Sequence, residues 1–279
     1  DVYPTIVPSY ENNKEILRKI VNDLKAAKDL LAKCDTIKEN KHWMSTENRM
    51  LAVNSGTSGE LAKDVFFAYR GYRMNYYAVT AMLARVYCWA GEYGNAYKEA
   101  KEVVDATYST GSTSTASCFN FSNSLTTNRK DYNSIIMTFF KSTCYEDYLP
   151  YMTKGNDVVL VVNTTNLFGD EAGADDRNLD LFGDWDGGDI KYSFKYDIKE
   201  GTSGTDMIPA IRLSEMYYIM GEYFAYKDEF SKAGEMLDKV RYARGISTTN
   251  LASSIGSLEV FHTHLIKEMR REFVGEGQM

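Results

Sequence analysis

Apolar residues recur at three- and four-residue steps in the N-terminal part of the chain. Over Asn12–Lys33, residues such as Ile16, Ile20, Leu24 and Leu31 would lie along one face of a helix. Charged residues fill the opposite face. This amphipathic pattern predicts a helix that packs on one side and faces solvent on the other.

Two further helices are predicted on either side of a tight turn at Gly91–Gly94. The first begins between residues 61 and 76 and ends at Ala90. The second runs from Asn95, a suitable N-cap, to about Thr107. Because small residues occur on the facing sides of both helices, we expect them to form a helical hairpin.

The helical pattern returns near the C-terminus. A helix is predicted from Ile208, with Pro209 in its first turn, where a missing N–H costs little. A turn at Asp228–Phe230 leads to a helix capped by Ser231. This helix is expected to end at Gly245, because glycine readily takes the left-handed conformation that follows a helix.

The last helix is predicted from Ser257 to about Val274. The turn segments Gly91–Ala96 and Asp228–Ala233 are alike, since both carry an aromatic residue at the turn and an alanine that opens the next helix. That pattern is typical of a tetratricopeptide (TPR) hairpin. The two copies lie 137 residues apart, so the sequence predicts an interrupted helical scaffold and not a regular solenoid.

Residues 110–204 have a different composition, dominated by Ser, Thr, Asn, Gly and Asp. Apolar runs at Ser134–Phe140 and Asp157–Val162 predict short strands or buried extended segments. A stretch of this length without long helices is too long for an ordinary loop. We therefore predict a mainly α fold, in which a TPR-like helical hairpin scaffold (1–109 and 205–279) carries a large, irregular, loop-rich inserted lobe (110–204).

Charge and composition exclude several classes of protein. The 279 residues include 32 basic and 39 acidic side chains, so the net charge of −7 argues against a nucleic-acid partner. No apolar run reaches the ~18 residues of a membrane-spanning helix. The four cysteines are isolated, without the paired spacing of zinc or redox sites. The 21 tyrosines are the unusual feature.

Several motifs occur in an order that resembles a known family. Pro-x-x-Arg-Leu-x-Glu-x-Tyr is matched at Pro209–Tyr217, and a helix ending in Val-Arg-x-x-Arg-Gly is matched at Val240–Gly245. Further matches lie at Ile20–Ala27, Ala78–Tyr87, Asp175–Arg177 and Glu268–Gly277. Together they are similar to the motifs of the SusD/RagB family of TPR-containing, glycan-binding outer-membrane lipoproteins of Bacteroidetes.

The resemblance implies a non-catalytic, cell-surface protein that binds an oligosaccharide or polysaccharide. It implies a SusC-like TonB-dependent outer-membrane transporter as partner in polysaccharide utilisation and nutrient uptake. It also implies a single SusD-like domain, 1–279, incomplete at both ends, because the family begins with a lipoprotein cysteine and continues past the Gly-Glu-Gly motif. A lipid anchor outside this chain would then hold the protein on the outer membrane, exposed at the cell surface.

The charged residues of these motifs are interpreted as ion pairs of the scaffold. Arg212 and Glu215 lie three residues apart and are expected to share a network, and Glu268, Arg271 and Glu272 interleave on the last helix. A glycosidase needs two carboxylates that face each other across a cleft. No catalytic residue is therefore predicted. A TPR-type scaffold for protein–protein interaction and, less favoured, a glycan-processing enzyme remain as alternatives.

Candidate sugar contacts are aromatic residues in predicted loops, because aromatic faces stack on the apolar faces of pyranose rings. The candidates are Tyr145, Tyr148, Tyr151, Tyr132, Trp185 and Trp43. The first three form the densest cluster, and for every candidate the alternative is packing of a loop onto the helical core. Trp89, at the end of a predicted helix, is assigned to the core.

An acidic, glycine-rich segment near residue 185 raises a calcium hypothesis. Asp184, Asp186 and Asp189 could supply oxygen ligands, although their spacing does not match an EF-hand loop. A solvated acidic surface is the favoured interpretation. No P-loop or Gly-x-Gly-x-x-Gly motif occurs, so no other cofactor is expected.

Overall fold

The computed structural model describes residues 12–45, 48–49, 65–110, 113–185, 187–197 and 206–277. The α-helices in these residues are α1 (Asn13–Asp35), α2 (Tyr76–Trp89), α3 (Tyr93–Val104), α4 (Cys144–Met152), α5 (Thr164–Phe168), α6 (Asp176–Leu181), α7 (Leu213–Ala225), α8 (Phe230–Ala243) and α9 (Leu258–Phe273). The strands are β1 (Thr107–Ser109), β2 (Thr115–Ser117), β3 (Ile135–Phe140), β4 (Val161–Asn163), β5 (Phe182–Asp184), β6 (Ile190–Ser193) and β7 (Met207–Arg212).

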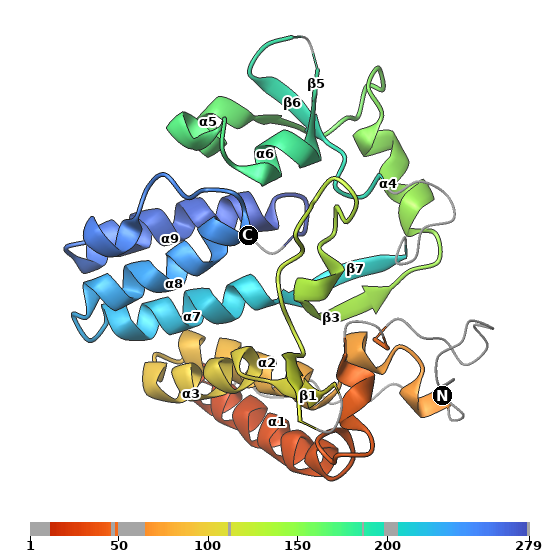
Figure 1. Ribbon diagram of the computed structural model, residues 1–279, viewed down its shortest axis with the longest axis vertical. Helices are drawn as coiled ribbons and strands as arrows, with labels where there is room; N and C mark the ends of the chain where they lie inside the picture. The colour runs from red at the N-terminus through yellow and green to blue at the C-terminus, as the bar shows by residue number, and fades with distance from the viewer. Residues whose placement is uncertain are drawn as a thin grey trace.

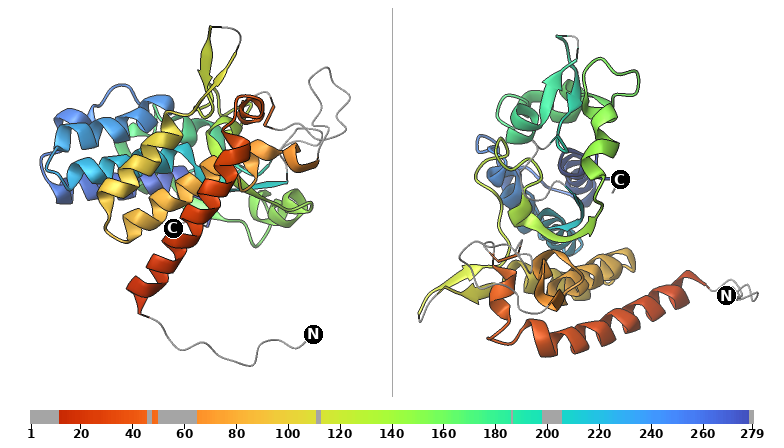
Figure 2. Two further views of the ribbon diagram at one scale, coloured as in Figure 1. Left: turned by 90° about the horizontal axis from the view of Figure 1, so that it is seen from below. Right: turned by 90° about the vertical axis from the view of Figure 1, so that its right-hand side faces the viewer.

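The scaffold helices stack in layers. In Figure 1 the stack rises from α1 through the α2–α3 hairpin to the α7–α8 hairpin and α9, and Figure 2 shows the same order from a second direction. The part of the lobe that carries α5, α6, β5 and β6 lies beyond α9, at the end of the stack opposite α1, whereas β3 lies lower, beside β7. The predicted mainly α fold, with a helical hairpin scaffold and an irregular lobe containing short strands, is confirmed.

The two helical hairpins share one turn geometry. Gly91 and Asp228 both take the left-handed conformation, with φ of 75° and 58°. Glu92 and Glu229 follow with nearly identical dihedrals, φ −88° and ψ 57° in one and φ −88° and ψ 59° in the other. The second helix of each hairpin therefore begins directly after these glutamates. The predicted N-caps Asn95 and Ser231 are wrong, because both lie inside the first turn of a helix.

The hairpins pack on each other through α3 and α7. The rings of Tyr97 and Tyr223 stack with centroids 4.4 Å apart, and Tyr93 stacks on Tyr226 at 3.9 Å. Small residues such as Ala96, at 0% exposure, let the helices within each hairpin approach closely. The tyrosine excess is thus used in part to join the two hairpins.

Residues 207–212 form strand β7, and not the predicted helical start at Ile208. β7 pairs with β3 in antiparallel register, with Phe140 opposite Met207 and Thr138 opposite Pro209. Met207, Pro209 and Ile211 are buried and alternate with less buried neighbours, which is the period of a strand. The helix begins only at Leu213. The prediction failed because a short apolar run, Met207–Ile211, fits both periods.

The lobe contains more helix than predicted. Besides the three-stranded sheet β4–β6–β5 it carries α4, α5 and α6, each of nine residues or fewer. Its main apolar cluster consists of Leu125, Phe168, Leu181 and Phe182. This cluster is much smaller than the scaffold core, so other interactions must hold the lobe in place.

Other expectations are also tested by the fold. Trp89 is 73% exposed on the last turn of α2, so its assignment to the core is wrong. All four cysteines are free. Ser257 caps α9 as predicted, accepting a hydrogen bond from the Val260 N–H, and Gly245 is left-handed after α8. Among the described residues, no helix combines the length and apolar composition needed to cross a bilayer.

Candidate functional site

The three clustered tyrosines lie on α4, a helix where a loop was predicted. Because successive residues of an α-helix turn by about 100°, residues three apart are displaced around the helix by only about 60°. Tyr148 lies in the middle and faces inward, where its ring stacks on Tyr196 at 4.4 Å and 7°. Tyr151 is 43% exposed and Tyr145 is half-buried. The helix therefore presents Tyr145 and Tyr151 on either side of an inward-facing anchor.

Charged groups lie beside these tyrosines. Asp147 of α4 accepts hydrogen bonds from the Thr143 hydroxyl at 2.7 Å and forms an ion pair with Lys141 at 2.6 Å. The hydrogen bond from Lys141 lowers the pKa of Asp147, so this carboxylate is ionised at neutral pH. A surface that combines aromatic faces with a carboxylate and an ammonium group can stack on sugar rings and hydrogen-bond their hydroxyls.

Trp185 lies in the turn between β5 and β6, where its backbone N–H donates to the Ile190 carbonyl at 3.2 Å. It is half-buried. The Lys154 ammonium, just after α4, donates to the Asp184 carbonyl at 2.9 Å. This contact ties the C-terminal end of α4 to the Trp185 turn. The structure thus brings Tyr151 and Trp185 to the same part of the lobe. We define the α4 surface as the surface formed by Tyr145, Asp147, Tyr151, Lys154 and Trp185.

Two aromatic residues next to this surface were not selected from the sequence. Phe139 and Phe140 end β3 and are both exposed, opposite Ile208 and Met207 of β7. Ile208 in turn packs against the cluster of Cys144, Met152, Tyr148 and Tyr196 below α4. One signal was available: neighbouring residues of a strand point to opposite faces, so Phe139-Phe140 could not both be buried on one face.

Tyr132 and Trp43 do not belong to the α4 surface. Trp43 is 7% exposed in the short 3₁₀ helix η1 (Lys41–Met44), and its ring stacks on Phe67 at 5.8 Å in the main core. Tyr132 is half-buried against Tyr72, and burial raises its pKa. Packing, the alternative left open by the sequence, therefore accounts for both. Trp43 is withdrawn as a sugar contact, because a buried ring has no face to offer.

The calcium hypothesis gains no support. Asp184 and Asp189 are exposed, and the nearest cation to the Asp184 carboxylate is Lys191 at 3.8 Å. Asp186 lies outside the described residues. In the part of the chain that the structure describes, no three His, Cys, Asp or Glu side chains are grouped to hold a metal ion.

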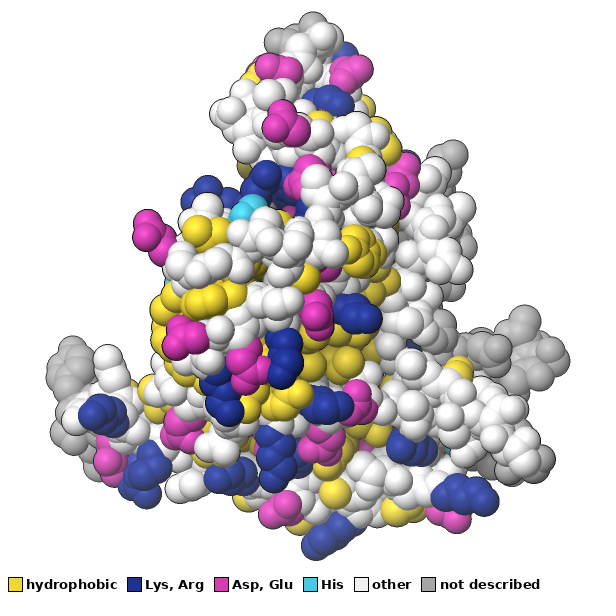
Figure 3. Space-filling view, turned by 60° about the vertical axis from the view of Figure 1, so that its left-hand side comes forward, with side chains coloured by type: hydrophobic (Ala, Val, Ile, Leu, Met, Phe, Trp, Pro, Cys, Tyr) yellow, Lys and Arg dark blue, Asp and Glu magenta, His cyan; other side chains and the backbone are white. Residues whose placement is uncertain are grey.

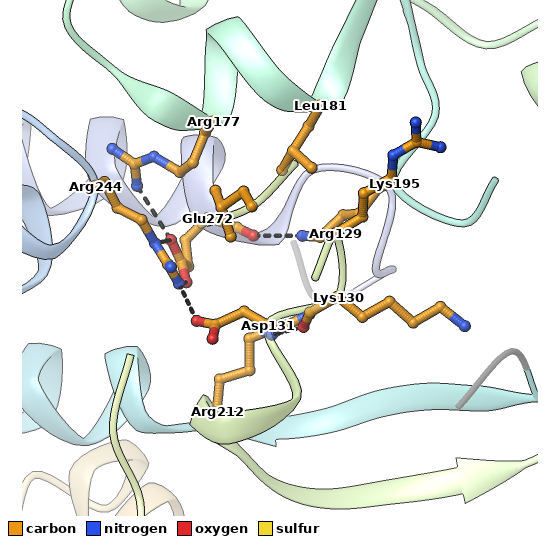
Figure 4. Close-up of a pocket in the computed structure, with 10 residues that line it drawn as sticks. Arg129, Lys130, Asp131, Arg177, Leu181, Lys195, Arg212, Arg244 and Glu272 are labelled. Carbon is orange, nitrogen blue, oxygen red and sulfur yellow. Dashed lines mark hydrogen bonds and ion pairs between the residues drawn. The ribbon is translucent and has the colours of Figure 1, made fainter. Parts of the chain in front are cut away.

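Buried ion pairs attach the lobe to the scaffold (Figure 4). Arg177 of α6 contacts Glu268 at 2.9 Å and Glu272 at 3.2 Å on α9, while Arg244, after α8, contacts Glu272 at 2.5 Å and Asp131 of the lobe at 2.8 Å. We call the cluster that contains these pairs the ion-pair lock. Further members are Glu171 with Arg241 and Arg271, Asp175 with Arg177, and Lys195 and Arg212 with Glu276.

The lock shifts the titration of its members. Burial alone would raise the pKa of Glu272, but the neighbouring Arg244 and Arg177 guanidinium groups outweigh it and hold this pKa well below its usual range. Burial lowers the pKa of Lys130, at the edge of the lock, to about 8. The cavity between these residues measures about 10 Å³, which is room for about one water molecule. These carboxylates are bound by arginines inside the protein, where no glycan could reach them.

Several solved structures with a similar fold are described as SusD-like, sugar-binding or glycan-binding proteins. A SusD-like carbohydrate-binding protein from Bacteroides vulgatus matches with a TM-score of 0.56 and 18% identity over 94% of this chain and 49% of its own. A SusD superfamily protein from Bacteroides fragilis matches with a TM-score of 0.60 and 17% identity over 95% of this chain and 53% of its own. The chain has the SusD fold.

A surface glycan-binding protein A from Bacteroides uniformis shares this SusD fold, with a TM-score of 0.56 and 17% identity over 95% of this chain and 56% of that protein. At such identities the likeness is one of fold, which confirms at that level the resemblance indicated by the motifs. The chain spans about half the length of the SusD-like proteins that it matches. No family model matches the sequence. No curated protein matches it either.

The motifs that carried the resemblance meet inside the SusD fold. Arg212 donates to both carboxylate oxygens of Glu276, 64 residues later, so the motifs Pro209–Tyr217 and Glu268–Gly277 are joined. The predicted network between Arg212 and Glu215 is wrong, because Glu215 pairs instead with Arg85 of α2 at 2.5 Å. The predicted pairing within α9 is confirmed, with Arg271 at 2.9 Å from Glu268.

Proposed function

We propose that this chain is the glycan-binding, non-catalytic part of a cell-surface protein, and that the α4 surface contacts the glycan. The single observation that carries the proposal is the Lys154–Asp184 contact, which links the segment after Tyr151 to the turn that holds Trp185, in a lobe that the ion-pair lock fixes to a SusD-fold scaffold. The exposed Tyr151 ring offers an apolar face, and Asp147 and Lys154 offer hydrogen-bonding groups. SusD-like structures described as carbohydrate-binding support the ligand class.

Calorimetric titration and a glycan array test this proposal. Tyr151→Ala and Trp185→Ala should each weaken binding, because one aromatic stack contributes about 1 kcal/mol, or roughly fivefold in affinity. Tyr148 is a poorer test than its position in the cluster suggests, since its ring also packs on Tyr196. Matched controls exist on the scaffold: Tyr242 is 46% exposed on α8, and Trp89 is exposed on α2.

Two results would contradict the proposal. If Tyr242→Ala and Trp89→Ala weaken glycan binding as much as the lobe variants do, the site is not on the α4 surface. If the purified protein hydrolyses a glycan that it binds, the non-catalytic assignment is wrong.

The partner and the location are proposed with the same function. A SusC-like TonB-dependent outer-membrane transporter would receive the glycan for nutrient uptake, and a lipid anchor outside these 279 residues would hold the protein at the cell surface. The SusD fold and the motif resemblance support this arrangement. Co-purification of the tagged full-length protein with a β-barrel transporter tests the partner, and fractionation with protease accessibility of whole cells tests the location.

A further inference from the structure

The tips of the two helical hairpins form a second hollow surface, far from the α4 surface. One depression of about 460 Å³ lies between the turns and is lined by Tyr93, Tyr223, Tyr226 and Lys227, among others. A second of about 450 Å³ runs along α1. Both volumes are in the range of small-ligand sites, roughly 300–1,000 Å³. Glu92 and Asn95 line both depressions, so these are adjacent, and we call the pair the tip groove.

Aromatic rings form the floor at one end of the tip groove. Tyr93 and Tyr226 stack on each other with centroids 3.9 Å apart, and Tyr226 remains 45% exposed. A second stack, Tyr97 on Tyr223, joins the same two helices, and Tyr223 lines the depression as well. An exposed ring that is already held by a neighbour loses little freedom when a ligand stacks on it. This end of the groove is therefore suited to the flat apolar face of a sugar ring.

Basic side chains line the other end, along α1. Lys14, Arg18 and Lys25 are exposed there, and Lys227 adds a fourth cation beside the aromatic floor. Glu92 is the one carboxylate among the lining residues of the two depressions, all of which are described. The groove is thus locally cationic in a chain whose net charge is −7. Arg18 also pairs with Glu15 at 2.6 Å, so Lys14, Lys25 and Lys227 carry most of this excess.

Two of the lysines are held in place by tyrosines. The Lys25 ammonium lies 5.7 Å from the centroid of the Tyr87 ring, and Lys227 lies 4.9 Å from that of Tyr223. The Asn95 side-chain amide donates to Glu92 at 2.7 Å. In the view that brings this end of the scaffold forward, basic, acidic and hydrophobic side chains interleave over the surface (Figure 3). The groove therefore presents positioned cations next to stacking faces.

We propose that the tip groove binds an acidic oligosaccharide, one that carries carboxylates on its sugar rings. Its rings would stack on Tyr226, and its carboxylates would contact Lys25, Lys14 and Lys227. Charge complementarity decides the ligand class, because Lys14, Lys25 and Lys227 have no carboxylate partner among the described residues and a neutral glycan would not supply one. An acidic peptide would satisfy the cations but would leave the aromatic floor unused. The site is separate from the α4 surface and does not depend on it.

Calorimetric titration of the chain with oligogalacturonate tests the proposal, and the methyl-esterified oligomer serves as the uncharged ligand of the same backbone. Lys25→Gln should weaken binding about threefold to fivefold, the upper range for an exposed charge pair. Tyr226→Ala should weaken it about twofold to tenfold, while Tyr226→Phe should preserve it, because the ring is kept. Salt should weaken binding of the acid form, since the charges are exposed.

Matched controls are available on α8. Lys239→Gln and Tyr242→Ala change an exposed lysine and a tyrosine of the same exposure outside the groove, so neither should alter the affinity. Tyr151→Ala and Trp185→Ala should leave oligogalacturonate binding intact even if they abolish binding of a neutral glycan. Failure at the α4 surface and failure at the tip groove are thereby told apart.

Three results would overturn the proposal. One is equal binding of the methyl ester, which would show that the cations are not used. Another is equal binding of a poly-glutamate peptide, which would show that the rings are not used. The third is the absence of oligogalacturonate binding by a chain whose circular dichroism shows it to be folded.

Discussion

The scaffold and the lobe bury different kinds of side chain. Between the scaffold helices the buried residues are mostly alanines, aliphatic residues and tyrosines, as at Ala81, Leu83 and Ala100. Between lobe and scaffold they are arginines, lysines and carboxylates, and Arg177 and Arg271 are as buried as core phenylalanines. Apolar contacts are non-directional, whereas a guanidinium–carboxylate pair fixes both distance and angle. The contrast suggests that the scaffold supplies stability and the lock supplies orientation of the α4 surface.

One of the two largest effects should come from breaking the lock at its centre. Glu272→Gln removes a buried negative charge that accepts from Arg177 and Arg244. Asp175 and Glu268 still pair with Arg177, and Asp131 with Arg244, so the interior is left with one uncompensated positive charge. The free energy of unfolding should fall by about 3–5 kcal/mol, as for other buried pairs that lose one partner. Urea unfolding followed by circular dichroism measures it.

The control for that variant is Glu229→Gln, which breaks an exposed pair with Lys232 at the α7–α8 turn. Stability there should hardly change, because an exposed pair is screened by water and salt. If both variants had the same small effect, the lock would contribute no net stability and the comparison between the two regions would fail.

A second test compares the two apolar cores directly. Leu83→Ala, at 0% exposure in the scaffold core, should cost about 3–5 kcal/mol, since packed neighbours on all sides prevent the cavity from closing. Leu181→Ala, in the small lobe cluster, should cost about 2 kcal/mol, because fewer neighbours surround it. Thermal and urea unfolding of both variants provide the measurement. Equal losses would mean that the lobe has a core as complete as that of the scaffold.

Acid should weaken the lock before it weakens the scaffold. Burial would raise the pKa of Glu171, but hydrogen bonds from Arg271, Thr249 and Arg241 lower it to about 2. A carboxylate with a depressed folded pKa stabilises the protein above its unfolded pKa, and that stabilisation disappears as the pH falls from about 4.5 to about 2. The stability difference between wild type and Glu171→Gln should therefore be about 3 kcal/mol at pH 7 and should vanish near pH 2. A difference that is constant with pH would contradict the ionic origin.

The smallest effect is expected at a helix end of the scaffold. Ser257→Ala removes the N-cap of α9, whose hydroxyl accepts from the Val260 N–H at 3.2 Å. The cost should be about 1 kcal/mol, typical of an exposed cap, and Ser257→Asp should restore most of it. Thermal unfolding is precise enough for this difference. A loss above that of Glu171→Gln would mean that local capping outweighs the lock.

Prediction from the sequence was accurate where local rules decide the structure. The helix at 12–33, the two equivalent turns at Gly91 and Asp228, and the cap at Ser257 follow from residue spacing and from backbone preferences of single residues. The ion pairs inside α9 are local as well, because residues three apart on a helix are neighbours.

Errors arose where a distant segment decides the outcome. Residues 207–212 became a strand because β3 pairs with them, and α4 became a helix whose Tyr148 packs on Tyr196, 48 residues later. Trp89 and Trp43 exchanged their expected roles, since exposure depends on which neighbours cover a ring. In the candidate site, the sequence selected Tyr151 and Trp185 as aromatic residues, and only the contact of Lys154 with Asp184 brought them together.

The sequence by itself determined the helical hairpins and their two matching turns, the division into scaffold and lobe, and the motifs of a SusD-like chain. These features depend on interactions within one turn or one helix, which the order of residues already contains. Only the tertiary structure decided that Arg212 pairs with Glu276, that Arg244 pairs with Asp131 of the lobe, and that the hairpin tips line an open depression. Those partners are distant in the chain, and buried charges choose among many possible partners by geometry that the fold alone supplies.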